Sequence, residues 1–283
     1  MLAGRTIDYL AIGHVAKDLT PQGARLGGTV AFAALTARAL DYTSAVVTAH
    51  GEELDLSPLA GIPVERVPSP TSTTFENIYG PHGRRQFLRA RAVPLTLEST
   101  PTDWRRAPIV HLAPLARELD PNLAAAFPNS FVGLTPQGWL RTWDAEGRVS
   151  QDDWPEAFAA LPHASATVIS IEDVRGDWSL VERWARPLGV SRVLAVTEGA
   201  QGSTIFAQGE GPRRFPARPQ TEADPTGAGD IFAAAFFIHL YETGDPWASA
   251  RFANEVAALS VTRVGLEGVP TPEEIGLCRI RAM

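Results

Sequence analysis

Short apolar runs alternate with alanine-rich stretches along most of the chain. The apolar runs predict buried strands at Ile7–Ile12, Ala45–Thr48, Ile109–Leu112, Phe131–Leu134, Thr167–Ile171 and Val193–Thr197. The intervening stretches predict helices at Thr29–Leu40, Glu156–Leu161, Trp178–Ala185, Ile231–Glu242 and Trp247–Thr262. This alternation is typical of an α/β fold with a mostly parallel sheet that is covered by helices on both faces.

Two segments interrupt this order and look like β-structure outside the main sheet. Lys17–Arg25 is polar and follows the first strand, whereas Thr73–Tyr79 and Arg84–Ala90 flank a Gly-Pro turn and predict a hairpin. Ligands in open α/β sheets gather beyond the carboxyl ends of the strands. We therefore expect a small β-lid, built from segments at about 14–26 and 72–92, to cover a bound molecule.

Composition narrows the classes of partner. The 283 residues are 45% hydrophobic and 20% charged, which suits one soluble globular domain. A net charge of −7 disfavours nucleic acid and anionic membranes as partners. Cys278 is the only cysteine, so disulfides within the chain are excluded and a reducing cytoplasm is expected. We see no secretory signal or bilayer-spanning run in the sequence.

The segment Asp224–Asp230 reads Asp-Pro-Thr-Gly-Ala-Gly-Asp and runs directly into an apolar helix. Its glycines allow successive backbone N–H groups to face one point, and the following helix adds the positive end of its dipole. The segment therefore predicts a site for a phosphate or a developing negative charge. Asp230 can either complement the helix dipole or act as a general base beside a phosphoryl group.

Three further blocks accompany this segment: Gly13–Asp18, Gly27–Gly28 and Val196–Ser203. Together the four blocks resemble the ribokinase-like, or PfkB, carbohydrate kinases. The resemblance implies a single three-layer α/β/α sandwich over residues 1–283, with a mostly parallel central sheet and a small β-lid. It also implies transfer of the γ-phosphoryl group of ATP to a hydroxyl of a sugar or polyol, with Mg²⁺ as cofactor.

Residue roles follow from the same resemblance. It implies catalysis by Asp230, with an anion hole formed by Gly227, Ala228 and Gly229. It implies substrate binding by Asp18, Gly27, Gly28, Thr29 and Asn77. It implies nucleotide binding by Thr197, Gly199, Gly202, Thr226 and Asn254, and a metal near Asp173 and Asp224. The chemistry agrees, because a carboxylate can accept the proton of an alcohol, and one backbone N–H donor to the phosphoryl oxygens can contribute roughly 3 kcal/mol.

Two departures from the family pattern bear on the substrate. Phe32 stands where many relatives have an asparagine that binds sugar hydroxyls. Ser170–Asp173 replaces an Asn-x-x-Glu pattern that organises magnesium and phosphate in relatives. Both departures make ribose a weaker expectation. The segment Thr73–Asn77 and the Ser170–Asp173 block resemble the inositol-kinase-type branch of the family.

Several alternatives stay open at this stage. One is a sugar- or nucleotide-binding regulatory relative with weakened catalysis, and another is a nucleoside kinase, which Phe32 and Phe75 facing the substrate would favour. The sequence also leaves open a monovalent cation and a homodimer formed through the lid. The second lid segment carries four arginines: Arg84, Arg85, Arg89 and Arg91. The favoured interpretation is that they form a solvated face, whereas arginines that point inward would indicate a substrate that already carries a phosphate.

Overall fold

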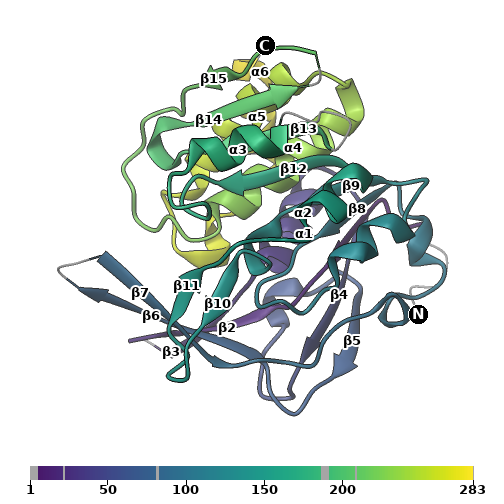
Figure 1. Ribbon diagram of the computed structural model, residues 1–283, viewed down its shortest axis with the longest axis vertical. Coiled ribbons are helices and arrows are strands. Elements are labelled where there is room, and N and C mark those ends of the chain that lie inside the picture. Colours follow the sequence, from purple (N-terminus) through teal and green to yellow (C-terminus); the bar gives the residue numbers. More distant parts are fainter. Residues whose placement is uncertain (1–5, 22, 81–82, 186–190, 208, 283) are drawn as a thin grey trace.

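The central sheet of the computed structural model is flanked by helices (Figure 1). The structure describes residues 6–21, 23–80, 83–185, 191–207 and 209–282. In these residues the central sheet has nine strands in the order β15-β14-β13-β12-β9-β8-β1-β4-β5. The strands are β1 (Tyr9–Ile12), β4 (Ser44–His50), β5 (Val64–Pro68), β8 (Ile109–Leu112), β9 (Phe131–Leu134), β12 (Ala164–Ser170), β13 (Ser191–Thr197), β14 (Ser203–Ala207) and β15 (Arg213–Phe215). Pairing is parallel from β13 to β5, whereas β14 and β15 are antiparallel.

Helices bury both faces of this sheet. The helices are α1 (Thr29–Ala39), α2 (Ala157–Ala160), α3 (Trp178–Ala185), α4 (Ala228–Thr243), α5 (Pro246–Ser260) and α6 (Pro272–Ala282). Along β1, Tyr9 and Ala11 join the apolar cluster that contains α1, α4 and α5. Leu10 and Ile12 join the cluster on the opposite face, with α2 and α3. Because strand side chains alternate between the two faces, both sets are buried, and the result is the predicted three-layer sandwich.

A second sheet lies beside the carboxyl ends of the central strands, with the order β3-β2-β6-β7 (Figure 1). Its strands are β2 (Ala16–Thr20), β3 (Gly23–Gly27), β6 (Thr73–Gly80) and β7 (Gly83–Ala90). A short hairpin of β10 (Arg141–Trp143) and β11 (Val149–Gln151) adjoins it through a bridge between Phe87 and Arg148. We refer to the four-stranded sheet as the lid sheet.

Short 3-10 helices connect the regular elements. They are η1 (Ser57–Leu59), η2 (Leu97–Ser99), η3 (Trp104–Arg106), η4 (Pro121–Ala126), η5 (Pro136–Gly138), η6 (Leu161–His163), η7 (Gly199–Gln201) and η8 (Gly265–Gly268).

The predicted strands and helices occur at the expected places, with ends shifted by a few residues. The prediction omitted β5, α6 and the strands of the 141–151 and 203–215 regions. β10 and β11 have three residues each, so they carry no usable periodicity. The turn at 81–82 of the predicted 73–90 hairpin lies outside the described residues.

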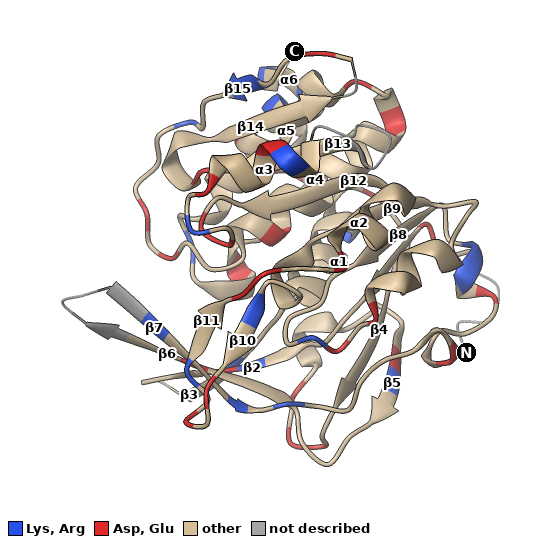
Figure 2. Cartoon of the chain, viewed as in Figure 1, with Lys and Arg blue, Asp and Glu red and all other residues tan. Residues whose placement is uncertain are grey.

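Acidic and basic residues are interspersed over the surface elements (Figure 2). The fold therefore presents mixed charge in this view, in line with the modest net charge of the chain. Among the residues that the structure describes, no helix combines the length and hydropathy needed to cross a bilayer.

Candidate active site

A cavity of about 740 Å³ lies between the carboxyl ends of the central strands and the lid sheet. Its size is in the usual range for small-molecule sites. Of the residues predicted from the sequence, the cavity is lined by Asp18, Gly28, Thr29, Asn77, Asp173, Thr197, Gly199, Gly202, Thr226, Gly227, Ala228, Gly229, Asp230 and Asn254. Gly27 and Asp224 are outside this lining. Segments far apart in sequence thus contribute to one cavity.

The N-terminus of α4 forms one wall of the cavity. The helix starts at Ala228, directly after Gly227, whose φ of 83° is left-handed. A left-handed residue with no side chain lets the chain turn sharply here, and the first helical turn has N–H groups without partners inside the helix. The Ala228 N–H donates to the Pro225 carbonyl at 3.2 Å. The positive end of the α4 dipole lies at the same place. This arrangement can bind an anionic group.

Asp230 stands in the first turn of α4, within this wall. Burial raises its pKa to about 6, although a hydrogen bond from Thr29 and the nearby charge of Arg141 act in the opposite direction. Asp173 and Asp18 raise the pKa further through charge repulsion. A carboxylate with a pKa near 6 is ionised at neutral pH and is a stronger base than an ordinary aspartate. Asp230 can therefore accept a proton from a hydroxyl in the cavity.

Phe32 supports the glycine turn that precedes Asp230. A Cβ atom on Gly227 would lie 2.2 Å from Cε1 of Phe32, so the ring packs directly against the backbone of the turn. Phe32 is 2% exposed and its ring also lines the cavity. The aromatic ring that departs from the family pattern thus contacts the predicted anion hole itself.

The lid side of the cavity contains Asp18, Asn77 and Gln86. A Cβ atom on Gly27 would lie 2.1 Å from Oδ2 of Asp18, so Gly27 makes room for that carboxylate. Asn77 and Gln86 pair across β6 and β7, with the Gln86 amide donating to Asn77 Oδ1 at 3.1 Å. These polar groups from two hairpins could bind hydroxyls of a substrate.

Arg141, at the start of β10, is a cavity residue that the sequence reasoning missed. Its guanidinium lies 5.4 Å from the centre of the Phe75 ring and donates to the Leu115 carbonyl at 3.3 Å. Its charge lowers the pKa of both Asp230 and Asp173. Gln86 and Gln137 were missed as well. None of these residues belongs to a block that matched the family, and no periodicity marks them.

The arginines of the second lid segment differ in their contacts. Arg89 pairs with Glu76 at 2.6 Å and stacks on Phe87, and Arg91 lies over Trp143. Arg85 is exposed at the cavity rim, and the side chain of Arg84 lies outside the described residues. Arg89 and Arg91 therefore follow the solvated-face interpretation.

The two carboxylates predicted near a metal have different surroundings. Burial raises the pKa of Asp173, which accepts from the Ser170 N–H at 3.0 Å and lines the cavity. Burial acts on Asp224 too, but hydrogen bonds from the N–H groups of Thr226 and Gly265 hold its pKa below the usual range. Each Asp224 oxygen accepts one of these bonds, so this side chain stabilises the turn.

The opposite end of the cavity is lined by small and apolar residues. Thr197 ends β13, Gly199 and Gly202 lie between β13 and β14, and Ala257 and Val261 come from α5 and the residue after it. A flat aromatic ring could lie between such walls.

Asn254 stands at this end of the cavity. Its amide group donates to Ser203 Oγ at 3.1 Å and to the Phe215 carbonyl at 3.0 Å. Asn254 therefore fixes the β14 and β15 strands at this end.

Comparison with known proteins supports the class of protein that the fold and site indicate. Residues 179–273 match the model of the pfkB family carbohydrate kinases. The chain is 43% identical over 83 residues to a ribokinase of Bacillus subtilis, which is 29% of this chain and 28% of the relative. The matched segment thus spans less than a third of that curated relative. The predicted resemblance to PfkB carbohydrate kinases is confirmed.

Solved structures of this family share the fold. A pyrophosphate-dependent kinase in the ribokinase family, complexed with a pyrophosphate analog and myo-inositol, has a TM-score of 0.79 and 23% identity, and the match covers 95% of this chain and 99% of that one. Arabidopsis thaliana ribokinase, complexed with ribose and ATP, has a TM-score of 0.71 and 18% identity, with 97% and 99% covered. These similarities confirm the predicted ribokinase-like fold class.

Proposed function

We propose that this protein is a carbohydrate kinase that transfers the γ-phosphoryl group of ATP to a hydroxyl of a sugar or polyol. The observation that carries the proposal is Asp230, which has a pKa of about 6 and stands in the first turn of α4 inside the cavity. Asp18 and Asn77 line the same cavity from the lid side. A hydroxyl held there could lose its proton to Asp230 as the phosphoryl group arrives.

The charge that develops on the phosphoryl group needs its own stabilisation. The N–H groups of Gly227, Gly229 and Asp230 and the dipole of α4 would supply it, because they are already oriented before the reaction. The Ala228 N–H, which donates to the Pro225 carbonyl at 3.2 Å, would have to be shared. We assign this role to Gly227, Ala228 and Gly229, together with the supporting ring of Phe32.

ATP is the donor that the cavity supports best. Of the two solved structures with this fold described above, one is complexed with ATP and the other with a pyrophosphate analog. Here the small residues Gly199, Gly202 and Ala257 leave an apolar space at the far end of the cavity, next to Thr197. The adenine ring of ATP could bind in such a space, whereas pyrophosphate has no apolar part that could fill it.

Magnesium fits this site as a partner of the donor phosphates. Among the described residues, no group of three or more His, Cys, Asp or Glu side chains could hold a metal ion alone. Mg²⁺ usually keeps water and phosphate ligands and takes only one or two carboxylates from the protein. Asp173 lines the cavity and could be such a carboxylate, and the ion would neutralise phosphate charge.

The nucleoside kinase is a second candidate, because Phe32 and Phe75 both line the cavity. Phe75 is only 3% exposed and lies beneath the Arg141 guanidinium, so little of its ring is left for a base. We also propose a homodimer through the lid, since β3 is an edge strand of the lid sheet. A cytoplasmic location is proposed because Cys278 is the only cysteine of the sequence.

A direct assay tests the proposal. The purified protein is incubated with Mg²⁺, with ATP or pyrophosphate as donor, and with sugars, polyols or nucleosides, and phosphorylated products are detected by mass spectrometry. We expect a sugar or polyol phosphate and an equal amount of ADP. Calorimetric binding of ATP and a sugar without transfer would instead identify a regulatory relative, and transfer only from pyrophosphate would refute the choice of donor.

A further inference from the structure

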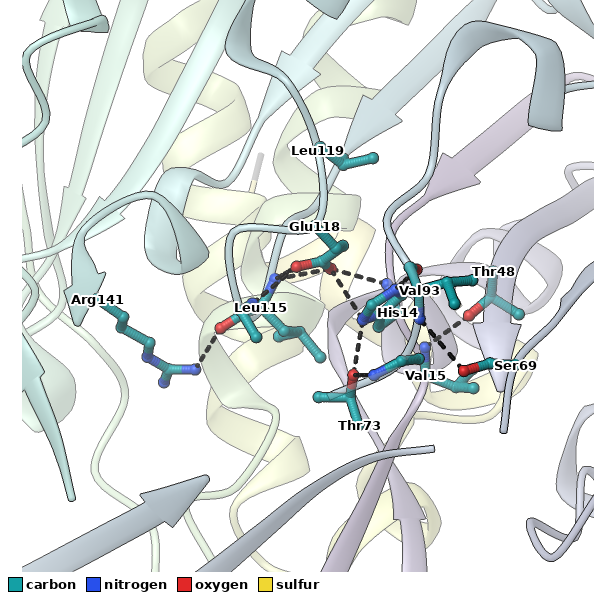
Figure 3. Close-up of polar contacts among 12 residues, drawn as sticks. His14, Val15, Thr48, Ser69, Thr73, Val93, Leu115, Glu118, Leu119 and Arg141 are labelled. Carbon is teal, nitrogen blue, oxygen red and sulfur yellow. Dashed lines mark hydrogen bonds and ion pairs between the residues drawn. The ribbon is translucent and has the colours of Figure 1, made fainter. Parts of the chain in front are cut away.

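A buried polar network lies where the lid sheet joins the central sheet (Figure 3). His14 is fully buried and occupies the segment that links β1 to β2. Its Nε2 lies 2.9 Å from the Val93 carbonyl, and its Nδ1 lies 2.7 Å from Thr73 Oγ1. Because a carbonyl only accepts, Nε2 carries a proton and donates it to Val93. The imidazole therefore joins three chain segments.

These three segments are crossings between the two sheets. His14 precedes β2, Thr73 begins β6, and Val93 follows β7. Thr73 Oγ1 also accepts from the Ala92 N–H at 3.0 Å, which fixes the same crossing a second time. One side chain thus holds the base of the lid sheet at three points.

Glu118 connects the lid crossings to Leu115, which lines the cavity. The carboxylate is 1% exposed and accepts hydrogen bonds from the N–H groups of His14 at 2.9 Å, Leu115 at 2.9 Å and Ala116 at 2.7 Å. Leu115 lines the cavity, and its carbonyl accepts from Arg141 (Figure 3). The charge of Arg141 lowers the pKa of Asp230 and Asp173. The contacts therefore run without interruption from the lid crossings to Arg141, whose charge acts on Asp230 and Asp173.

We propose that His14 and Glu118 are positioning residues that hold the lid sheet in register with the floor of the active site. Asp18 lies four residues after His14 on β2, and Asn77 lies four residues after Thr73 on β6. Both would bind the acceptor from the lid, whereas Asp230 acts from the floor. Productive transfer needs these two sides at a fixed separation, because small displacements of reacting groups lower the rate steeply. This role rests on the proposed kinase function.

A matched pair of threonines separates positioning from plain stability. Thr73 and Thr48 are both fully buried, and both bond to the segment 14–15, Thr73 through the His14 ring and Thr48 through the Val15 N–H at 2.8 Å. Thr48 belongs to β4 of the central sheet, and its hydroxyl accepts from a single crossing, whereas Thr73 Oγ1 ties β6 to both the His14 ring and the Ala92 N–H. Thr73→Val and Thr48→Val therefore remove one hydroxyl each from equally buried sites.

Hydrogen exchange of the lid amides in β2 and β6 gives a readout that needs no turnover. We expect Thr73→Val and Glu118→Gln to speed this exchange about tenfold relative to Thr48→Val, because local opening no longer breaks those bonds. Equal exchange in Thr73→Val and Thr48→Val would overturn the proposal, even if Glu118→Gln fails to fold.

Kinetics with D-ribose and myo-inositol as probes then separate the two proposals. We expect Thr73→Val to raise the KM of whichever probe is phosphorylated about tenfold while the KM of ATP stays unchanged. A parallel rise in both KM values would contradict a role at the acceptor side. Absence of transfer from the wild-type protein to these probes and to every sugar and polyol of the screen would refute the kinase function, whereas the exchange measurement would still decide the role of His14 and Glu118.

Discussion

The two ends of the active-site cavity are built in different ways. The anion site comes from one continuous stretch, Asp224–Asp230, whose glycines and following helix lie next to one another in the sequence. The acceptor side is assembled from β2, β6, β7, β10 and the turn after β8. The anion site is therefore determined by neighbouring residues of the sequence, whereas the acceptor side depends on long-range packing. Substitutions at the two ends should differ in kind as well as in size.

The largest effect is expected at Asp230. Asp230→Asn keeps the shape of the side chain but removes the base, so kcat should fall by about 10²–10⁴-fold. Turnover is measured with ATP, Mg²⁺ and the best acceptor from the screen. Asp245→Asn is the matched control, because Asp245 caps the neighbouring helix α5 and lies outside the cavity lining. Unchanged turnover in Asp230→Asn would remove the carboxylate from the mechanism.

Gly227→Ala should damage both the turn and the reaction. An alanine at a left-handed φ of 83° costs about 1–2 kcal/mol of folding free energy, and its Cβ would also collide with Phe32. We expect lower stability in urea unfolding together with a large loss of kcat.

A double-mutant cycle with Phe32→Ala isolates the collision. In that background the unfolding cost of Gly227→Ala should shrink toward the backbone contribution. An identical cost in both backgrounds would show that Phe32 does not support the turn.

This difference between the two ends also explains what the sequence could predict. The glycine turn and its helix were placed correctly, because their geometry follows from residues a few positions apart. Arg141 was missed because a three-residue strand has no periodicity, and its place beside Asp230 depends on the packing of distant segments. Asp224 near the metal stays a prediction. Its oxygens accept bonds from Thr226 and Gly265, and the Gly265 bond could not be predicted from a local motif.

A substitution at the part of the cavity proposed for adenine should have a smaller effect, and this effect should concern the KM of ATP. Ala257→Phe would fill the apolar space proposed for adenine, so the KM of ATP should rise about tenfold or more. The acceptor KM should stay within the wild-type range, because Ala257 belongs to α5 and lies away from the lid. An unchanged KM for ATP would place the nucleotide elsewhere.

The smallest effect is expected at a single lid contact. Asn77→Ala removes one hydrogen-bonding group at the acceptor side and should raise the acceptor KM roughly three- to tenfold, with the ATP KM unchanged. Asn122→Ala serves as control, since Asn122 bonds to Asp120 in an exposed turn outside the cavity lining. Equal acceptor KM values in the two variants would exclude Asn77 from substrate binding.

The pH dependence of kcat/KM tests the central claim most directly. A base must be deprotonated to act, and burial raises the pKa of Asp230 to about 6. Activity of the wild-type protein should therefore rise with pH through about 6 and level off above it, and this step should be lost from the residual activity of Asp230→Asn. The same step in both proteins, or activity that falls as the pH rises through this range, would contradict the assignment of Asp230 as the general base.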